Sequence, residues 1–197
     1  MPSLLRPAIA AGSLSPAQPV LTDGTLTLRP WITGDIPGLV AAYAEPEIQR
    51  WHARSMSVAE AGDWIADAGQ TWSAGTAASW AVETDSLLAG RMTLRFHLPD
   101  GFAEAAYWTR STFSGRGVAS RALHAATEWA FSIGMHRVEL EHSTLNSASC
   151  RVALKAGFTA EGTRREGALH TDGWHDMHTH GKISAEATGS QATMPCA

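Results

Sequence analysis

Two spacings of apolar residues alternate along the chain and predict its elements. Alternation of apolar and polar residues, or a short apolar run between turn residues, indicates a β-strand, because neighbouring side chains point to opposite faces. Seven stretches fit, at residues 26–29, 78–82, 87–96, 102–108, 137–141, 158–165 and 176–183. Apolar residues three or four apart indicate an amphipathic helix. This spacing fits residues 36–44, 57–73, 119–133 and 146–155.

Capping signals support two of these helices. The sequence Ser57-Val58-Ala59-Glu60 is a capping box, in which the serine and glutamate side chains satisfy free amides at a helix start. Gly134 follows the third helix, at a position where glycine commonly ends a helix. Strands and helices that interleave in this way predict one α/β (α+β) domain.

The domain is expected to span residues 21–183. Residues 1–20 are rich in Ala, Pro and Ser, and their prolines interrupt the apolar patch that a signal peptide would need. Residues 184–197 are small and polar. We therefore expect a flexible tail at each end. Residues 45–56, between the first two helices, are expected to form a loop.

Composition and charge narrow the function. With 197 residues, of which 44% are hydrophobic, the chain can build one domain with a sizeable core. Its net charge of −4 argues against nucleic-acid binding, which usually needs a basic face. No apolar run approaches the roughly 20 residues that span a bilayer, so we expect no membrane association. Two cysteines are too few for a disulfide framework, and we expect a reduced, cytoplasmic protein.

A small-residue turn joins the strand at residues 102–108 to the helix at 119–133. It reads Ser114-Gly115-Arg116-Gly117-Val118-Ala119. Glycines let the backbone adopt positive φ and approach an anion closely, and the first amides of a helix have no partner inside it. A strand, a glycine turn and a helix in this order predict a site for a phosphate or pyrophosphate. The turn matches neither G-x-G-x-x-G nor the P-loop pattern.

The turn resembles the acyl-CoA loop of the GCN5-related N-acetyltransferases (GNAT superfamily), usually written Arg/Gln-x-x-Gly-x-Gly/Ala. Ser114 stands where Arg or Gln is usual, which predicts weakened affinity for CoA unless Arg116 supplies the missing charge. Two further segments carry the resemblance, and they read Asn146-Ser147-Ala148-Ser149, followed by Lys155-Ala156-Gly157-Phe158, and Leu26-Thr27-Leu28-Arg29-Pro30. Together they are most similar to the RimJ/RimL-type branch, which acetylates the α-amino group of ribosomal proteins.

This resemblance implies the GNAT acyl-CoA N-acyltransferase fold, with a mixed central sheet of about seven strands and four helices. It also implies an N-acetyltransferase that uses acetyl-CoA. The pantetheine arm would lie beside the end of the strand at 102–108, where that strand splays from its neighbour. The implied cofactor-binding residues are Tyr107, Trp108, Thr109, Ser114, Gly115, Arg116, Gly117, Val118, Ala119, Ser120, Asn146, Ser149 and Lys155.

The resemblance also suggests the catalytic residues. Ser149 matches the serine that acts as general acid toward the leaving thiolate, and its place inside the helix is not explained by capping. Glu104 matches a glutamate considered as general base, although it could equally be an exposed carboxylate paired with an arginine. His52 is the alternative base, because its unperturbed pKa is suitable. Cys150 is expected to pack in the core, so the amine would attack directly in a ternary complex.

The acceptor stays open between a protein N-terminus and a small-molecule amine. Trp31, Trp51 and His52 are expected to bind it, and together with Trp64 the tryptophans could wall a pocket for an apolar amine. They could equally fill the core. The chain would act as a monomer or homodimer. The alternative is an acyl-CoA-binding sensor or scaffold without turnover, which Ser114 favours.

Histidines gather near the C-terminal end of the expected domain. His170, His175, His178 and His180 have spacings that can ligate zinc. Such short spacings arise easily, and His178 and His180 fall on one face of the last expected strand. We therefore expect no metal and a pH-sensitive or solvated set of side chains. Hydrolysis at a zinc site is the corresponding third hypothesis.

Overall fold

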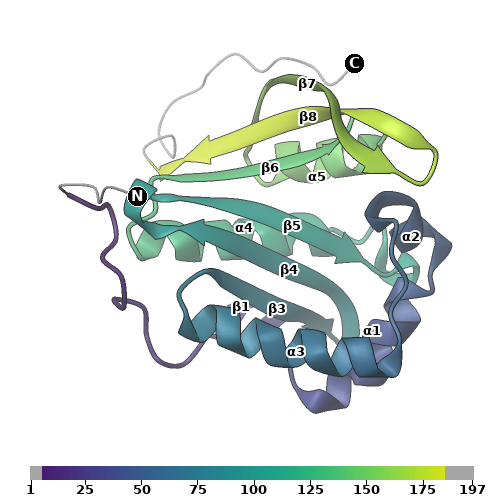
Figure 1. Cartoon of the computed structure of the whole chain (residues 1–197), viewed down its shortest axis with the longest axis horizontal. Helices are drawn as coiled ribbons and strands as arrows, with labels where there is room; N and C mark the ends of the chain where they lie inside the picture. The colour runs from purple at the N-terminus through teal and green to yellow at the C-terminus, as the bar shows by residue number, and fades with distance from the viewer. Residues whose placement is uncertain (1–5, 185–197) are drawn as a thin grey trace.

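The computed structural model describes residues 6–184, which form one mixed sheet with helices on both faces (Figure 1). The strands are β1 (Leu21–Asp23), β2 (Leu26–Pro30), β3 (Ala77–Thr84), β4 (Leu87–His97), β5 (Phe102–Thr109), β6 (Arg137–Ser143), β7 (Thr159–His170) and β8 (Gly173–Ile183). The helices are α1 (Ile36–Tyr43), α2 (Pro46–His52), α3 (Val58–Ser73), α4 (Val118–Ser132) and α5 (Ser147–Lys155). The strand order is β1-β2-β3-β4-β5-β6-β8-β7.

The sheet divides at the junction of β5 and β6. All other neighbours pair antiparallel, whereas β5 and β6 run parallel. Their pairing covers only Phe102–Glu104 against Arg137–Glu139, although both strands continue further. Figure 1 shows the two strands side by side at one end and diverging toward α2. The splay expected from the family resemblance is therefore present.

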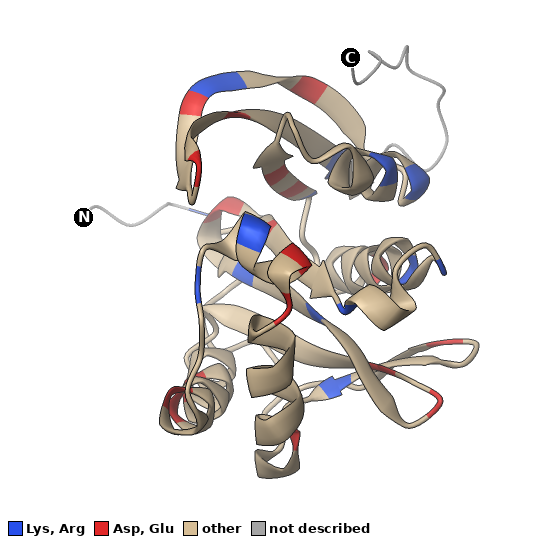
Figure 2. Cartoon of the chain, turned by 90° about the vertical axis from the view of Figure 1, so that its right-hand side faces the viewer, with Lys and Arg blue, Asp and Glu red and all other residues tan. Residues whose placement is uncertain are grey.

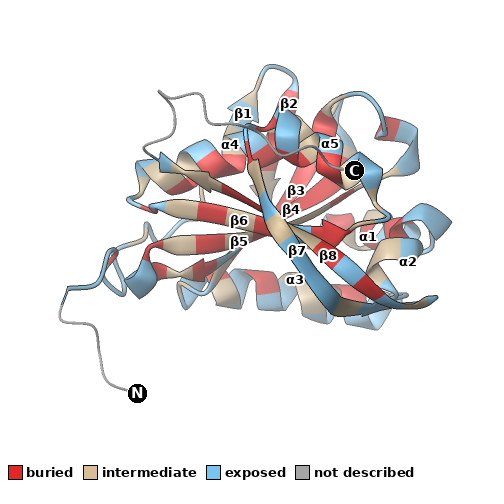
Figure 3. Cartoon of the chain, turned by 90° about the horizontal axis from the view of Figure 1, so that it is seen from above, coloured by how far each residue is buried: buried red, intermediate tan, exposed pale blue. Residues whose placement is uncertain are grey.

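Each face of the sheet buries its own core. The face under α4 and α5 holds the larger core, in which Trp80, Leu94, Leu123 and Phe158 are almost fully buried. The face under α1, α2 and α3 holds a second core around Trp31, Tyr43 and Trp108 and the small helix residues that pack on them. Figure 3 shows the buried strands at the centre of the sheet, while β7 at its edge is largely exposed.

Two elements were not predicted from the sequence. Strand β1 has three residues and no apolar alternation, so its signal is too short to read. Helix α2 lies within the expected loop at residues 45–56 and starts at Pro46, a residue favoured at the first helical position. Strands and helices therefore number eight and five, against the expected seven and four.

The N-terminal segment is not a free tail over its described part. The amides of Ala8 and Ile9 donate to the carbonyls of Pro99 and Leu98, and Ile9 is buried. The indole of Trp80 donates to the carbonyl of Pro19 at 2.8 Å. Residues 8–19 thus pack along the domain. The expected tail at 184–197 lies, apart from Ser184, outside the described residues.

Two global expectations can be compared with the structure. Within residues 6–184, no helix combines the length and the apolar character needed to cross a membrane. Lysine and arginine are interspersed with aspartate and glutamate along the elements (Figure 2).

Cys150 is buried, as expected, but it is disulfide-bonded. This departs from the expectation of a chain with reduced cysteines.

Candidate active site

The principal cleft opens where β5 ends and α2, α4 and α5 converge. Its volume is about 410 Å³. Its walls include the β5 residues Tyr107–Thr109, the glycine turn, the first turn of α4 and one side of α5. Twelve of the thirteen expected cofactor-binding residues line it, and Arg116 alone points elsewhere, with its guanidinium over the Phe113 ring. The structure thus gathers segments that lie more than 40 residues apart in the sequence.

The glycine turn presents bare backbone to this cleft. Gly115 and Gly117 have φ of 75° and 78°, the left-handed region that glycine enters without steric cost. A Cβ at Gly115 would meet no heavy atom within 4 Å. Among residues 6–184, no backbone carbonyl accepts from the amides of Gly115, Arg116 or Gly117. These amides and the free first turn of α4 can therefore bind an anion.

The splay frees amides on β5. The Arg110 amide donates to the Ala89 carbonyl on β4 at 2.9 Å. Because the amides of successive strand residues point to opposite sides, those of Tyr107 and Thr109 point away from β4, toward the side where pairing with β6 has ended. They face the gap in which a thioester carbonyl would find hydrogen-bond donors.

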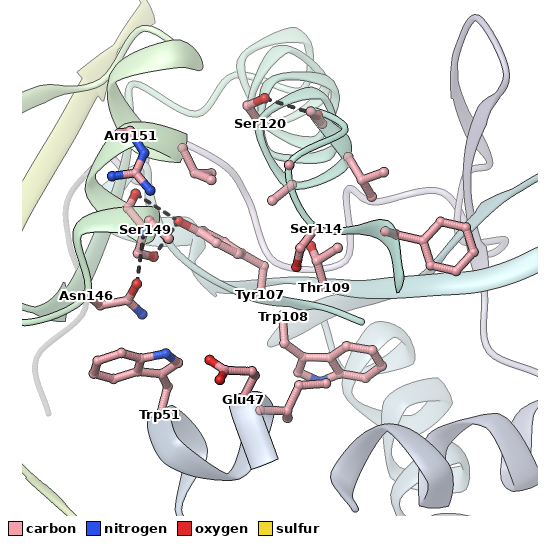
Figure 4. Close-up of a pocket in the computed structure, with 18 of the residues that line it drawn as sticks. Glu47, Trp51, Tyr107, Trp108, Thr109, Ser114, Ser120, Asn146, Ser149 and Arg151 are labelled. Carbon is pink, nitrogen blue, oxygen red and sulfur yellow. Dashed lines mark hydrogen bonds between the residues drawn. The ribbon is translucent and has the colours of Figure 1, made fainter. Parts of the chain in front are cut away.

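Two hydroxyl groups meet across the cleft. The hydroxyl of Tyr107 on β5 lies 2.8 Å from Oγ of Ser149 on α5. Burial raises the pKa of Tyr107 to about 12, and the hydrogen bond to Ser149 offsets part of this rise. The phenol is therefore protonated at neutral pH. Figure 4 shows the Tyr107 ring directed across the cleft toward Ser149.

Asn146 positions Ser149. Its Oδ1 accepts a hydrogen bond from the Ser149 amide at 3.0 Å and so caps α5. Asn146 also lines the cleft, so capping does not remove it from the site. Lys155 and Arg151 lie one helical turn apart on the same side of α5, and both line the cleft. Arg151 was not singled out in the sequence, although its spacing of four from Lys155 was a readable signal.

A second cleft, of about 420 Å³, lies on the other side of the splay. It is walled by β5, β6 and β8 and includes Glu104, Glu139 and Glu141. Glu104 pairs with His97 at 3.2 Å and is 44% exposed. The paired carboxylate expected as the alternative for Glu104 is thus present, with a histidine rather than an arginine as partner.

The two clefts share three residues, which are His52, Tyr107 and Ser149. His52 is the last residue of α2 and is half-buried. Burial, and second the positive charge of Arg91, lowers the pKa of His52 to about 4. Its imidazole is therefore neutral at pH 7. A ring with so low a pKa is a poor proton acceptor but a good neutral hydrogen-bond partner.

Helix α2 closes one side of the principal cleft. Trp51 and Glu47 project from it toward Tyr107 and Trp108 (Figure 4). Glu45, just before α2, binds the Arg110 guanidinium at 2.7 Å and the Ser111 amide at 2.8 Å. These bonds fix α2 against the end of β5. Glu47 was missed from the sequence because its segment was expected to be a loop.

The other aromatic residues expected at the acceptor site are in the core. Trp31 is 8% exposed, and its indole donates to Oγ of Ser79 at 3.3 Å. It packs edge-on against Trp64 at 5.2 Å between ring centroids. Neither tryptophan lines a cleft, so of the three expected pocket walls only Trp51 is placed at the site.

The C-terminal histidines are not a solvated set. His170 and His175 stack on each other, and His175 is only 8% exposed. His178 and His180 instead point under α5, where His180 is fully buried beside His142 of β6. The run divides into two clusters because His170 and His175 lie beside the β7–β8 turn, whereas His178 and His180 lie further along β8, where it pairs with β6.

Comparisons with known proteins agree with this geometry. The family described as acetyltransferase (GNAT) domain matches residues 25–159. Among solved structures, RimL, a ribosomal-protein α-N-acetyltransferase in complex with coenzyme A, has a TM-score of 0.77 at 22% identity and covers 84% of this chain and 98% of its own. Mycobacterium smegmatis RimJ with CoA-disulfide scores 0.77 at 20% identity and covers 87% and 89%.

A third similar structure is the microcin C7 self-immunity acetyltransferase MccE, in complex with acetyl-CoA and AMP. Its TM-score is 0.72 at 19% identity, and the match covers 82% of this chain and 93% of that one. At these identities the solved structures establish a shared fold. No curated protein sequence matches the chain significantly.

Proposed function

This chain belongs to the acetyltransferase (GNAT) family, and from that membership we propose that it transfers an acetyl group from acetyl-CoA to a primary amine. One observation carries the proposal: two separate clefts meet at His52, Tyr107 and Ser149. A cofactor in one cleft and an amine in the other would meet at the end of β5. The CoA and acetyl-CoA complexes of similar structures support this use of the fold.

The principal cleft would hold the cofactor. The bare amides of the glycine turn suit the pyrophosphate. Lys155 and Arg151, both exposed along the cleft, suit the remaining phosphate charge. Ser114 cannot supply the long hydrogen-bonding side chain of the usual Arg or Gln, and Arg151 is better placed than Arg116 to add positive charge. The arm would then run along β5 toward Tyr107.

Transfer would proceed by direct attack. The amine nitrogen bonds to the thioester carbon, and the carbonyl oxygen becomes an oxyanion that the Tyr107 or Thr109 amide stabilises, by about 3 kcal/mol for a typical donor. The intermediate then collapses with cleavage of the C–S bond. Ser149 gives its proton to the thiolate, and a proton from the solvent, relayed through the Tyr107 hydroxyl 2.8 Å away, restores both hydroxyl groups. Cys150 takes no part, because it is buried and disulfide-bonded.

Glu104 is the proposed base, acting through water. It lies three residues before Tyr107, roughly 10 Å along an extended strand, and therefore cannot touch the reacting nitrogen directly. It does line the second cleft, by which the amine would arrive. His52 lies at the junction, and as a neutral imidazole it would accept a hydrogen bond from the amine and orient it.

The acceptor cleft carries charges of both signs. Its carboxylates are Glu104, Glu139 and Glu141, and its guanidinium groups are Arg95 and Arg164. Arginines pair with Glu139 at 2.9 Å and with Glu141 at 2.8 Å, so Glu104 is the carboxylate without an arginine partner and the one that would attract an ammonium group. Of the expected aromatic walls only Trp51 lines a cleft, and it lines the principal one, so the apolar contact for the acceptor is smaller than the sequence suggested. Both a peptide N-terminus and a small-molecule amine fit this description.

The test is release of CoA from acetyl-CoA with a panel of N-terminal peptides and small primary amines, with acetylated products identified by mass spectrometry. Turnover with at least one acceptor is expected. Tight binding of CoA without release for any acceptor would favour the alternative, a non-catalytic acyl-CoA sensor or scaffold. Absence of CoA binding would contradict both.

A further inference from the structure

Three histidines converge under α5, outside both clefts. His142 of β6 stands opposite His178 of β8 in the strand register, and His180 lies two residues further on the same face. The rings of His142 and His180 stack at 5.0 Å, and those of His142 and His178 meet edge-on at 5.5 Å. One nitrogen from each ring lies within 4.8 Å of one nitrogen from each of the others.

The hydrogen bonds of this cluster leave two of its ring nitrogens without a partner. Nδ1 of His142 lies 2.8 Å from the Ser143 carbonyl, which can only accept, so this nitrogen carries the proton. Nε2 of His142 is then a lone pair, 3.0 Å from Nε2 of His180. Nδ1 of His178 and Nδ1 of His180 are buried without a hydrogen-bond partner among the described residues. A buried polar cluster this incomplete is unusual in a folded protein.

We propose that His142, His178 and His180 bind a first-row divalent cation of the zinc class. Zinc binds imidazole nitrogen at about 2.0–2.1 Å, which places two nitrogens of a tetrahedral site roughly 3.4 Å apart. The His142–His180 separation of 3.0 Å is close to this value, and the remaining nitrogen separations, at most 4.8 Å, would have to shorten by up to about 1.4 Å on binding. The Ser143 carbonyl orients His142 in the way that outer partners orient metal-binding imidazoles.

The proposal rests on the imidazoles alone. The sulfur of Cys150 on α5 belongs to the same cluster, but this residue is already disulfide-bonded. Three histidines with one open position are an established ligand set for zinc. None of the three lines either cleft, so the ion would stabilise the β6–β8 layer under α5 rather than take part in acetyl transfer.

The experiment uses the full chain without an affinity tag, freed of metal by a chelator and dialysed against zinc chloride. We expect saturable uptake of one ion per chain and a rise in melting temperature with zinc concentration, since an ion that binds only the folded state stabilises it by mass action. With cobalt as the probe, the visible absorption bands of a tetrahedral site should appear.

Variants separate this site from adventitious binding. His178→Gln and His142→Gln should each weaken uptake by at least the ~10–100-fold that loss of an outer partner costs. His178 is used in preference to the fully buried His180 because it is half-buried, so its replacement disturbs packing less. His136→Gln, at an exposed histidine just before β6, should bind zinc as the parent chain does.

Three results would overturn the proposal. They are no saturable uptake by the folded chain, equal uptake by parent and His178→Gln proteins, and loss of uptake by a folded Cys150→Ser variant. The last would make the sulfur a required ligand. These readouts are metal content, absorption and melting temperature, so they stand or fall independently of acetyl transfer.

Discussion

Ser149 is fixed through both its backbone and its side chain. Its amide is held by the Asn146 cap, and its hydroxyl faces Tyr107 at 2.8 Å. We predict that Ser149→Ala lowers kcat by about 10²-fold, the lower end of general acid catalysis, while the Kd for acetyl-CoA changes little. Tyr107→Phe should show a smaller loss of the same kind.

The matched control is Ser132→Ala, which removes an exposed serine of α4 that lines neither cleft. Single-turnover rates and acetyl-CoA titrations of the three variants would check the prediction. An unchanged kcat in Ser149→Ala across pH would rule out this serine as the acid.

The role of Glu104 is tested by comparison with Glu139, the residue that pairs with it on β6. Glu104→Gln should lower kcat/KM for the amine by about 10²-fold, most strongly at low pH where the amine is protonated. Glu139→Gln removes a carboxylate from the same cleft, one that is paired with Arg137 at 2.9 Å, so it reports the loss of a cleft charge without the loss of the proposed base. Equal losses in both variants would show that Glu104 attracts the amine without accepting its proton.

His52 should make stability depend on pH. Its pKa is about 4 in the folded chain against 6.5 for the free group. Between these values the unfolded chain binds more protons, so the contribution of His52 is complete above pH 6.5 and is lost as pH falls toward 4. The slope is at most about 1.4 kcal/mol per pH unit.

Urea unfolding of the parent and His52→Gln proteins at several pH values isolates this contribution. The difference in unfolding free energy between the two should shrink steadily as pH falls through that interval. A difference that stays constant with pH would mean that His52 is accessible to solvent and titrates normally.

At the scale of elements, the turn before α4 depends on two glycines with positive φ. Gly117→Val should destabilise the chain by about 1–2 kcal/mol, the cost of a left-handed conformation for an L-residue. It should also weaken acetyl-CoA binding, because a branched side chain would stand beside the free amides of the cleft.

Gly12→Val is the matched control for this change. Gly12 has φ of 75° and no heavy atom within 4 Å of its Cβ position, but it lies outside both clefts. Calorimetric titration and thermal melts of the two variants should show similar destabilisation and a binding defect in Gly117→Val alone. A similar Kd in both variants would contradict a role for this turn in cofactor binding.

Helix α2 shows how an element acquires its place from contacts far along the chain. Glu45 reaches Arg110 and Ser111 beyond the end of β5, and these bonds hold Trp51 and His52 over the cleft. Burial of the Glu45 carboxylate opposes its ionisation, but the Ser111 amide and the Arg110 guanidinium outweigh burial and lower its pKa. The contact between Glu45 and Arg110 is therefore an ion pair at neutral pH.

At the scale of the whole molecule, the splayed sheet gives two entrances to one junction. The proposed function places the cofactor in one cleft and the amine in the other, and from this we predict that initial rates at varied acetyl-CoA and amine give intersecting double-reciprocal lines. Parallel lines would indicate a covalent acetyl-enzyme. A Cys150→Ser variant provides the control, because direct transfer predicts that its kinetic pattern is unchanged.

The sequence was sufficient for seven strands, four helices and the glycine turn, because side-chain periodicity and positive-φ glycines are local properties. It did not reveal α2, whose seven residues pack on β7 through long-range contacts. It placed Trp31 at the acceptor site, whereas burial against Trp64 makes it core. Large aromatic residues serve both purposes, and only their neighbours distinguish them.

The sequence by itself determined the order of all helices and strands except β1 and α2, and the position of the glycine turn, since both follow from residues adjacent in the chain. Tertiary structure decided which side chains meet. The Tyr107–Ser149 contact joins residues 42 positions apart, and the histidine cluster joins β6 to β8 across 38. Such contacts depend on strand register and on where β5 and β6 part, and no local pattern encodes either.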